Sequence, residues 1–177
     1  GADILDIGGE SSRPGADSVS LQEEQDRVLP VIEALRKESD IPLSIDTTKY
    51  ELAKEAVELG VTIINDVSGG SDPRLMALLS EFPKTQLVLM HRKGDSKTMQ
   101  VDPQYPLGAV SEVKSFFEKK VKQFQESGVD PERLWVDPGI GFGKKLNHNL
   151  DLLRHLKTFV EVGGRVVIGT SRKSFLS

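Results

Sequence analysis

The chain has 177 residues and a formal net charge of -4, and 37% of its residues are hydrophobic and 28% charged. This balance is typical of one folded domain and excludes a disordered chain. The acidic excess argues against nucleic acid as the main partner, because phosphate binding requires a basic surface. There are no cysteines, so disulfides and thiolate metal sites are excluded, and no apolar run is long enough to span a membrane.

The chain opens with a predicted strand and a predicted helix joined by a polar loop. Apolar and acidic residues alternate over 2–7, which is the pattern of a strand. The loop over 10–16 carries hydroxyl groups and one arginine. Ser20 and Glu23 then fit a capping box at the start of an amphipathic helix, and Pro30 is expected to kink or divide this helix.

Two more strand and helix pairs follow in the same order. Residues 43–46 form a short strand that ends on an aspartate, and a second capping box over 48–51 predicts a helix after it. Residues 61–67 are a β-branched run that predicts a buried strand. Asp72 and Pro73 then fit the cap and the first position of a third helix.

The second half of the chain continues this alternation. The predicted strands are 87–91, 134–137 and 165–169. The predicted helices between them are 113–124 and 149–159, and Asn149 is expected to cap the second. The polar segment 92–106 is long for a loop in a compact domain, and such loops usually cover a site or are mobile.

Apolar strands that alternate with amphipathic helices predict an α/β fold with a parallel sheet covered by helices. An open doubly wound sheet and a TIM (β/α)8 barrel both fit this alternation. The barrel is favoured because chemically useful residues follow strand after strand, and in a barrel all these strand ends share one face. The residues at these ends are Asp46, Asn65, Met90, His91, Asp137, Ser171, Arg172 and Lys173.

The segment 137–144 places a carboxylate before a loop with three glycines. Glycine has no Cβ, so the backbone N–H groups of such a loop can approach a planar ligand closely. The segment is not a phosphate-binding P-loop, because Lys144 is followed by Lys145 and not by Ser or Thr. From this segment alone, a ligand site and a tight turn with a capping aspartate both stay open.

Four of these residues can form one polar set for a flat heterocycle. Asp46, Asn65 and Asp137 offer acceptors and donors that suit an amino-heterocycle with N–H groups along one edge. Lys173 suits the carbonyl or ring nitrogen of the same molecule. Each residue alone is more simply explained as a cap, a turn former or a solvated side chain, and their joint occurrence at strand ends favours a site.

Two further pairs of residues suit an anion. Ser12 and Arg13 in the first loop can contact a polyphosphate or a carboxylate, which the arginine fork fits well. Arg172 and the helix start expected after Ser171 offer a second anion site.

Six segments, in this order and spacing, resemble the dihydropteroate synthase family. They are 6–15, 44–47, 64–69, 89–91, 137–144 and 171–175. Any one segment is weak evidence, but the set covers nearly the whole chain and is strong. The resemblance implies a (β/α)8 barrel transferase of folate biosynthesis. Such an enzyme condenses 6-hydroxymethyl-7,8-dihydropterin pyrophosphate with p-aminobenzoate, giving 7,8-dihydropteroate and pyrophosphate, with Mg²⁺ as its cofactor.

The resemblance also implies roles for residues of this chain. Those implied to bind the pterin are Asp46, Asn65, Met90, Asp137, Gly141, Phe142 and Lys173. Those implied to bind pyrophosphate or p-aminobenzoate are Ser12, Arg13, Ser171 and Arg172. Those implied to be catalytic are Arg13, Asp137 and Lys173. Similar enzymes need no general base on the protein, because their pocket stabilises developing charge and positions the attacking amine.

Further properties follow from the resemblance alone. It implies a sulfonamide target that is cytoplasmic, with an organelle as the alternative. It also implies a homodimer at full length and, in some cases, fusion to a pyrophosphokinase. The partners are then small-molecule substrates, and neither nucleic acid nor a membrane is expected.

The family pattern extends past both ends of this chain. Its first strand, with an asparagine near the metal, would lie before Gly1, and its last strand would lie after Ser177. We therefore expect residues 1–177 to be a single pterin-binding domain truncated at both ends, with about six strands and no metal ligand of its own. A barrel of six strands out of eight cannot close, so the isolated chain is expected to be a poor catalyst.

Two other functions stay open. A pterin-binding barrel that moves a methyl group from methyltetrahydrofolate to a corrinoid can share the pocket of Asp46, Asn65 and Asp137. It has no need of the loop over 12–15 or of the cations at 172–173. A non-catalytic remnant is the second alternative, and the expected truncation favours it.

Overall fold

The computed structural model describes residues 1–13, 15–94, 98–171 and 173. Its single sheet has six parallel strands, each hydrogen-bonded to its neighbours in the sequence. The strands are β1 (Leu5–Gly8), β2 (Leu43–Asp46), β3 (Ile63–Asp66), β4 (Gln86–Met90), β5 (Leu134–Asp137) and β6 (Arg165–Val166). A doubly wound sheet would reverse its strand order near the middle, whereas this order runs straight from β1 to β6. The predicted α/β barrel, incomplete and with about six strands, is therefore confirmed.

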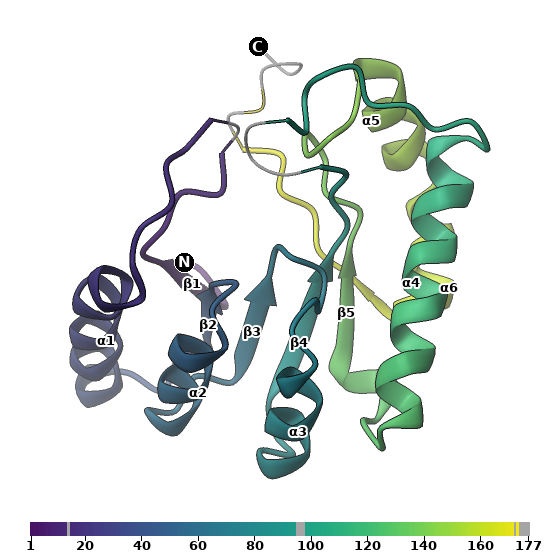
Figure 1. Cartoon of the computed structure of the whole chain (residues 1–177). Helices are drawn as coiled ribbons and strands as arrows, with labels where there is room; N and C mark the ends of the chain where they lie inside the picture. The colour runs from purple at the N-terminus through teal and green to yellow at the C-terminus, as the bar shows by residue number, and fades with distance from the viewer. Residues whose placement is uncertain (14, 95–97, 172, 174–177) are drawn as a thin grey trace.

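Helices cover the outer side of the curved sheet (Figure 1). They are α1 (Leu21–Glu38), α2 (Tyr50–Glu58), α3 (Arg74–Glu81), α4 (Ala109–Glu126), α5 (Leu146–Arg154) and α6 (Leu156–Gly163), with a short 3₁₀ turn, η1 (Pro131–Arg133). In Figure 1 the strand arrows point toward one end of the molecule, where the loops after β1 and β4 rise above the sheet. None of the helices in the described ranges is long and apolar enough to cross a membrane.

The register of the strands divides the sheet into two chemically different faces, because ladder partners in a parallel sheet point to the same side. The outer face is apolar and packs against the helices in the core; it carries Leu43, Ile45, Ile64, Leu87, Leu89, Leu134 and Val136. The inner face is more polar; it carries the polar residues Asp6, Ser44, Asp46, Asn65, Gln86, Asp137 and Arg165 and the apolar residues Ile63, Val88, Met90 and Trp135. The fold therefore gathers polar groups on the concave side of the sheet.

Helix α1 begins as its sequence predicts and runs through its proline. The Ser20 hydroxyl accepts a hydrogen bond from the Glu23 backbone N–H at 3.2 Å, while the Glu23 side chain pairs with Arg27. Pro30 does not divide the helix, which is continuous from Leu21 to Glu38. Pro30 is exposed, so water can satisfy the carbonyl that loses its partner.

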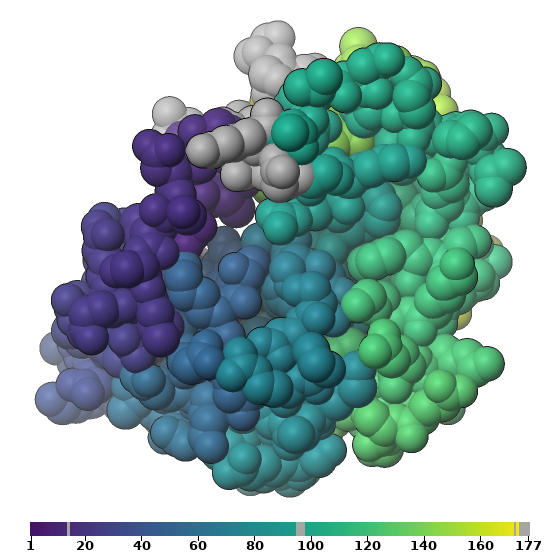
Figure 2. All heavy atoms as spheres, in the orientation of Figure 1, coloured from purple at the N-terminus to yellow at the C-terminus, as the bar shows by residue number. Residues whose placement is uncertain are grey.

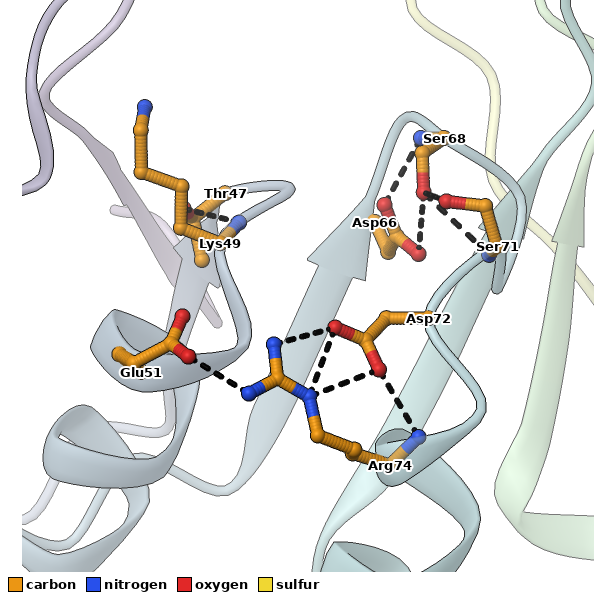
Figure 3. A network of polar contacts seen from close by, with 8 residues as sticks. All are labelled: Thr47, Lys49, Glu51, Asp66, Ser68, Ser71, Asp72 and Arg74. Carbon is orange, nitrogen blue, oxygen red and sulfur yellow. Dashed lines mark hydrogen bonds and ion pairs between the residues drawn. The ribbon is translucent and has the colours of Figure 1, made fainter.

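Two predicted caps are wrong. Helix α2 has no side-chain cap, because Thr47 rather than Thr48 accepts from a backbone N–H, that of Lys49 at 3.1 Å. Glu51 turns away to pair with Arg74 (Figure 3). Asn149 lies inside α5 rather than at a helix start, and it is 3% exposed. In both helices, tertiary contacts override the local capping pattern.

Candidate functional site

Four predicted site residues lie at or next to the carboxyl ends of the four neighbouring strands β2 to β5, on the inner face of the sheet. Asp46 of β2 is the ladder partner of Asn65 in β3, and Met90 of β4 is the partner of Asp137 in β5. Asn65 pairs with Val88, two residues before Met90, so all four side chains have the same facing. The parallel register of the strands thus brings these four side chains to the carboxyl edge of one face of the sheet.

Acidic groups surround Asp46. Burial, then the charges of Asp6, Glu24, Asp66 and Glu10, raises the pKa of the Asp46 carboxyl group from 3.8 to about 7. Every one of these neighbours carries a negative charge, so the carboxylate form of Asp46 has little support from the protein. A ligand that donates hydrogen bonds would supply that support.

Lys49 joins the loop after β1 to helix α1. Its ammonium pairs with Glu10 in the loop and, at 2.5 Å, with Glu24 in the helix. Glu24 is 1% exposed, and its other oxygen has no hydrogen-bond partner. Figure 3 shows the Lys49 side chain extending away from the surface pair of Glu51 and Arg74. The buried carboxylate of Glu24 therefore depends on this one cation from the start of α2.

A cavity of about 170 Å³ opens beside these acids. Its lining combines the loop after β1, the end of β2 and residues after β3 and β4, namely Glu10, Ser11, Ser12, Ala16, Ser18, Glu24, Asp46, Thr47, Thr48, Val67 and Arg92. Figure 2 shows the surface hollowed between the purple segment after β1 and the blue and teal segments. Asp46 and Ser12 line this cavity, whereas Asn65, Asp137 and Lys173 do not.

Asp137 lies in a different electrostatic environment. Its Oδ1 accepts a hydrogen bond from the Gly139 N–H at 2.7 Å. Burial raises the pKa of Asp137 to about 6, and the Gly139 N–H and the charges of Lys144 and Lys173 oppose that rise. The burial cost of the Asp137 carboxylate is thus partly offset by cations.

Lys173 joins the group around Asp137. Its Nζ lies 4.2 Å from the centre of the Phe142 ring, in a cation–π contact. A Cβ built on Gly141 would lie 3.2 Å from the Lys173 side chain, so the glycine allows this close approach. Burial lowers the pKa of Lys173, the charge of Asp137 raises it, and the charge of Arg13 lowers it.

The turn that follows β5 is braced by side chains that sequence reasoning missed. Asn149 Oδ1 accepts from the Gly141 N–H at 2.8 Å. Gln100 Nε2 donates to the Gly141 carbonyl at 2.6 Å, and the Tyr105 hydroxyl donates to the Gly143 carbonyl at 2.9 Å. The predicted long loop after β4 therefore packs against this turn. The sequence signal was weak, since a polar residue at a helix start is usually a cap.

Two more of the predicted residues belong to the described part of the chain. Arg13 and Ser171 are exposed. Arg172 lies outside the described residues. The structure thus forms two neighbouring groups on one face, with Asp46 and Asn65 in the first and Met90, Asp137, Phe142 and Lys173 in the second. Asn65 donates to Asp6 at 3.0 Å within the first group. The ligand roles of all these residues remain predictions.

Comparison with known proteins identifies one family over the whole chain. The profile of the pterin binding enzymes matches residues 1–177. Dihydropteroate synthase of Synechocystis sp. is 44% identical, in an alignment that covers 99% of this chain and 61% of the relative. Dihydropteroate synthase of Escherichia coli is 40% identical, with coverages of 99% and 62%. This chain therefore spans about three fifths of the length of these relatives.

Solved structures give the same result. The structure of the Yersinia pestis dihydropteroate synthase with a sulfonamide drug matches with a TM-score of 0.93 at 39% identity, covering 99% of this chain and 63% of that one. The Thermus thermophilus enzyme in complex with 4-aminobenzoate matches with a TM-score of 0.89 at 44% identity, covering 99% and 66%. The Xanthomonas albilineans enzyme in complex with 7,8-dihydropteroate matches with a TM-score of 0.85 at 38% identity, covering 99% and 62%.

Proposed function

Because the chain belongs to the family of pterin binding enzymes, we propose that it performs the chemistry of a dihydropteroate synthase. The reaction condenses 6-hydroxymethyl-7,8-dihydropterin pyrophosphate with p-aminobenzoate to give 7,8-dihydropteroate and pyrophosphate. The relatives named dihydropteroate synthase, at 40–44% identity, support this assignment. Residues 1–177 are proposed to act as one pterin-binding domain within it.

One observation carries the proposal. Asp46, Asn65, Met90 and Asp137 share the inner face of the sheet at its carboxyl edge. Carboxylates and an amide beside an apolar thioether suit a flat heterocycle with N–H donors on its edge. The acids around Asp46 favour a donor-rich or cationic guest, which a pterin with its guanidine-like edge provides.

The proposed mechanism rests on charge and position. Asp137 accepts hydrogen bonds from the guanidine-like edge of the pterin and favours positive charge as it develops on the pterin methylene. Ser12, Arg13 and Ser171 contact the departing pyrophosphate or the carboxylate of p-aminobenzoate. The aniline nitrogen then attacks the methylene as its bond to the pyrophosphate oxygen breaks, and the anilinium proton passes to the pyrophosphate or to water. No general base on the protein is required, and proximity supplies much of the rate.

The test is calorimetry with pteroic acid, followed by a condensation assay. We expect pteroic acid to bind the chain and Asp137→Asn to weaken its affinity about 100-fold, because a buried, charge-assisted hydrogen bond is lost. The matched control is Asp40→Asn, since Asp40 is exposed, and it should bind as the parent does. Absence of binding by the parent would leave the non-catalytic remnant as the better description.

A methyl-transfer assay separates the other catalytic candidate. A methyltransferase would move a methyl group from methyltetrahydrofolate to a corrinoid and ignore p-aminobenzoate. Ser12 in the cavity lining and Arg13 near Lys173 favour an anionic substrate instead. We therefore expect condensation, even if slow, and no methyl transfer.

Further properties are proposed on the family resemblance. Sulfonamides compete for the p-aminobenzoate position, which the sulfonamide complex of the Yersinia pestis relative supports. The enzyme is cytoplasmic and homodimeric at full length, with fusion to a pyrophosphokinase as a variant.

The Mg²⁺ cofactor that the family implies is not assigned to residues of this chain. In the described part of the chain, no group of three or more His, Asp or Glu side chains is arranged to hold a metal ion. We therefore derive no step through Mg²⁺.

A further inference from the structure

Lys144 is a buried cation that the reaction above does not use. It is 3% exposed. Its Nζ lies 3.0 Å from His91 Nδ1, 3.1 Å from the His91 carbonyl oxygen and 2.9 Å from the Phe142 carbonyl oxygen. Three acceptors match the three N–H donors of an ammonium group, whereas a neutral amine would have one donor too few. The geometry therefore fits Lys144 in its charged form. Burial lowers the pKa of Lys144 to about 7 against the charge of Asp137, so the ammonium is the main form near pH 6 and is lost as the pH rises through 7.

His91 is suited to act as one of these acceptors. It is 7% exposed. Burial, then the charge of Lys144, lowers the pKa of His91 to about 3, so its imidazole is neutral near neutral pH. A neutral imidazole carries a proton on one nitrogen only. Because Nδ1 faces the ammonium, the proton belongs on Nε2.

Lys144 also closes the turn that orients Asp137. The His91 N–H donates to the Asp137 carbonyl at 2.9 Å, which continues the ladder between β4 and β5. Gly139 approaches His91 so closely that an added Cβ would lie 1.9 Å from the His91 carbonyl oxygen. The N–H of this same glycine holds Asp137 Oδ1. The ammonium thus joins the main chain of the turn, at Phe142, to the main chain just after β4, at His91.

The charges around the pair are few. Lys144 and Lys173 face Asp137. Asp137, Lys173 and Lys93 face Lys144, together with the neutral ring of His91. Asp137 is the carboxylate among them, so its ionisation depends on the two lysines nearest to it.

We propose that Lys144 is a positioning residue for Asp137: its buried ammonium fixes the turn over 138–143 and keeps the Asp137 carboxylate ionised and aimed at the inner face of the sheet. The consequence for pterin binding rests on the function proposed above. The structural statement does not, and it can be tested without a ligand.

The first test follows Asp137 in the ligand-free chain by ¹³C NMR of its carboxyl carbon during a pH titration. In the parent the midpoint is expected near pH 6. In Lys144→Met it should rise by about one pH unit, because a nearby cation is removed. Lys145→Met is the matched control, since the neighbouring Lys145 is exposed and pairs with Asp102; it should leave the midpoint unchanged. An unchanged midpoint in Lys144→Met would overturn the proposal.

A second measurement uses the parent protein and does not depend on a variant that folds. The ¹⁵N shifts of the His91 ring should report a proton on Nε2 and an acceptor at Nδ1. A proton on Nδ1 would overturn the proposal, because Lys144 would then lose one of its three acceptors.

A chemical rescue sharpens the result. The chain has no cysteine, so Lys144→Cys creates a single thiol that can be aminoethylated in the unfolded state and refolded. The product carries an ammonium group on a side chain that differs from lysine only by a sulfur atom in place of one methylene group. The Asp137 midpoint should return toward that of the parent, whereas alkylation with a neutral group of similar size should not restore it.

Binding of pteroic acid then separates the two proposals. If the parent binds it and Lys144→Met loses affinity mainly on the acid side, both proposals hold. If the parent does not bind it but the NMR midpoints differ as expected, the proposed function fails while Lys144 keeps its positioning role.

Discussion

The polar face at the strand ends has two halves, and they place a buried carboxylate in opposite electrostatic environments. The first half contains Asp46 and Asn65, and the second contains Met90, Asp137, Phe142 and Lys173. Asp46, at the end of β2, has acidic neighbours that all push its pKa upward, to about 7. Asp137, at the end of β5, has Lys144 and Lys173 beside it, and they hold its pKa to about 6 against a larger burial. The charges that act on the Asp46 carboxyl group are thus acidic, whereas those that act on Asp137 are the cations Lys144 and Lys173.

This difference shows which half needs a ligand more. Burial of a carboxylate is costly unless a donor or a cation stabilises it. The protein supplies both to Asp137, through the Gly139 N–H and the lysines. On the Asp46 side, Lys49 is already shared between Glu10 and Glu24. Arg92 lines the same cavity as Asp46, but it is not among the groups that shift the Asp46 pKa. We infer that a ligand rich in hydrogen-bond donors would stabilise the Asp46 carboxylate more than the Asp137 carboxylate, because the protein already stabilises the second.

The largest expected effect breaks the second half. Gly139 has φ of 66°, and an added Cβ would lie 1.9 Å from the His91 carbonyl oxygen. Gly139→Ala should lower the free energy of unfolding by about 4 kcal/mol, from left-handed strain plus a clash with backbone. Gly128→Ala is the control, because Gly128 has φ of 91° and open space around its Cβ position. It should cost only about 1 kcal/mol in urea unfolding. Equal losses would show that the close approach is unimportant.

The next effect removes Lys49, the cation that pairs with Glu24 in the described part of the chain. Lys49→Met leaves a carboxylate that is 1% exposed without its ion-pair partner. We expect a loss of about 3 kcal/mol in the free energy of unfolding, because an unpaired buried charge is strongly destabilising. Adding Glu24→Gln should recover part of the loss. Lys54→Met, which removes two surface pairs at 4.0 Å, with Glu58 and Glu81, should change stability by less than about 0.5 kcal/mol. A loss no larger than that control would contradict the role given to Lys49.

The smallest effect concerns pH. The folded chain holds the Asp46 proton more tightly than the unfolded chain does, since the pKa rises from 3.8 to about 7. The contribution of this group to stability is therefore fully present below pH 3.8 and is lost as the pH rises through 7. Asp46→Asn should raise the free energy of unfolding by about 2 kcal/mol at pH 8, and change it little at pH 4. Urea unfolding at both pH values checks this, and an equal change at both would refute it.

The sequence predicted the fold because its signals are local. Short apolar strands, amphipathic helices and polar strand ends define an alternation that only a few sheet topologies satisfy. The facing of Asp46, Asn65, Met90 and Asp137 followed from the same alternation and from the period of a strand. The choice of barrel over doubly wound sheet was correct because the residues at the strand ends pointed to a shared face.

The supporting contacts were not predictable, because they join residues that are distant in sequence. Lys144 meets His91 from 53 positions away, and Lys49 meets Glu24 from 25 positions away. Such contacts depend on tertiary packing, which single-sequence periodicity does not encode. Asn149 misled for the opposite reason: its local pattern suggested a cap, whereas the fold uses its amide to hold Gly141.

The strand register places the residues on the concave side of the sheet at two levels along the strand direction. Asn65 stands level with Val88, and Asp137 stands level with Met90, one pleat further on. Two residues along a parallel strand span about 7 Å. Asp46 and Asn65 therefore lie roughly that distance before Met90 and Asp137 along the strand direction. A flat ligand that contacts both levels must therefore lie obliquely across the strands, with its long axis tilted toward their carboxyl ends.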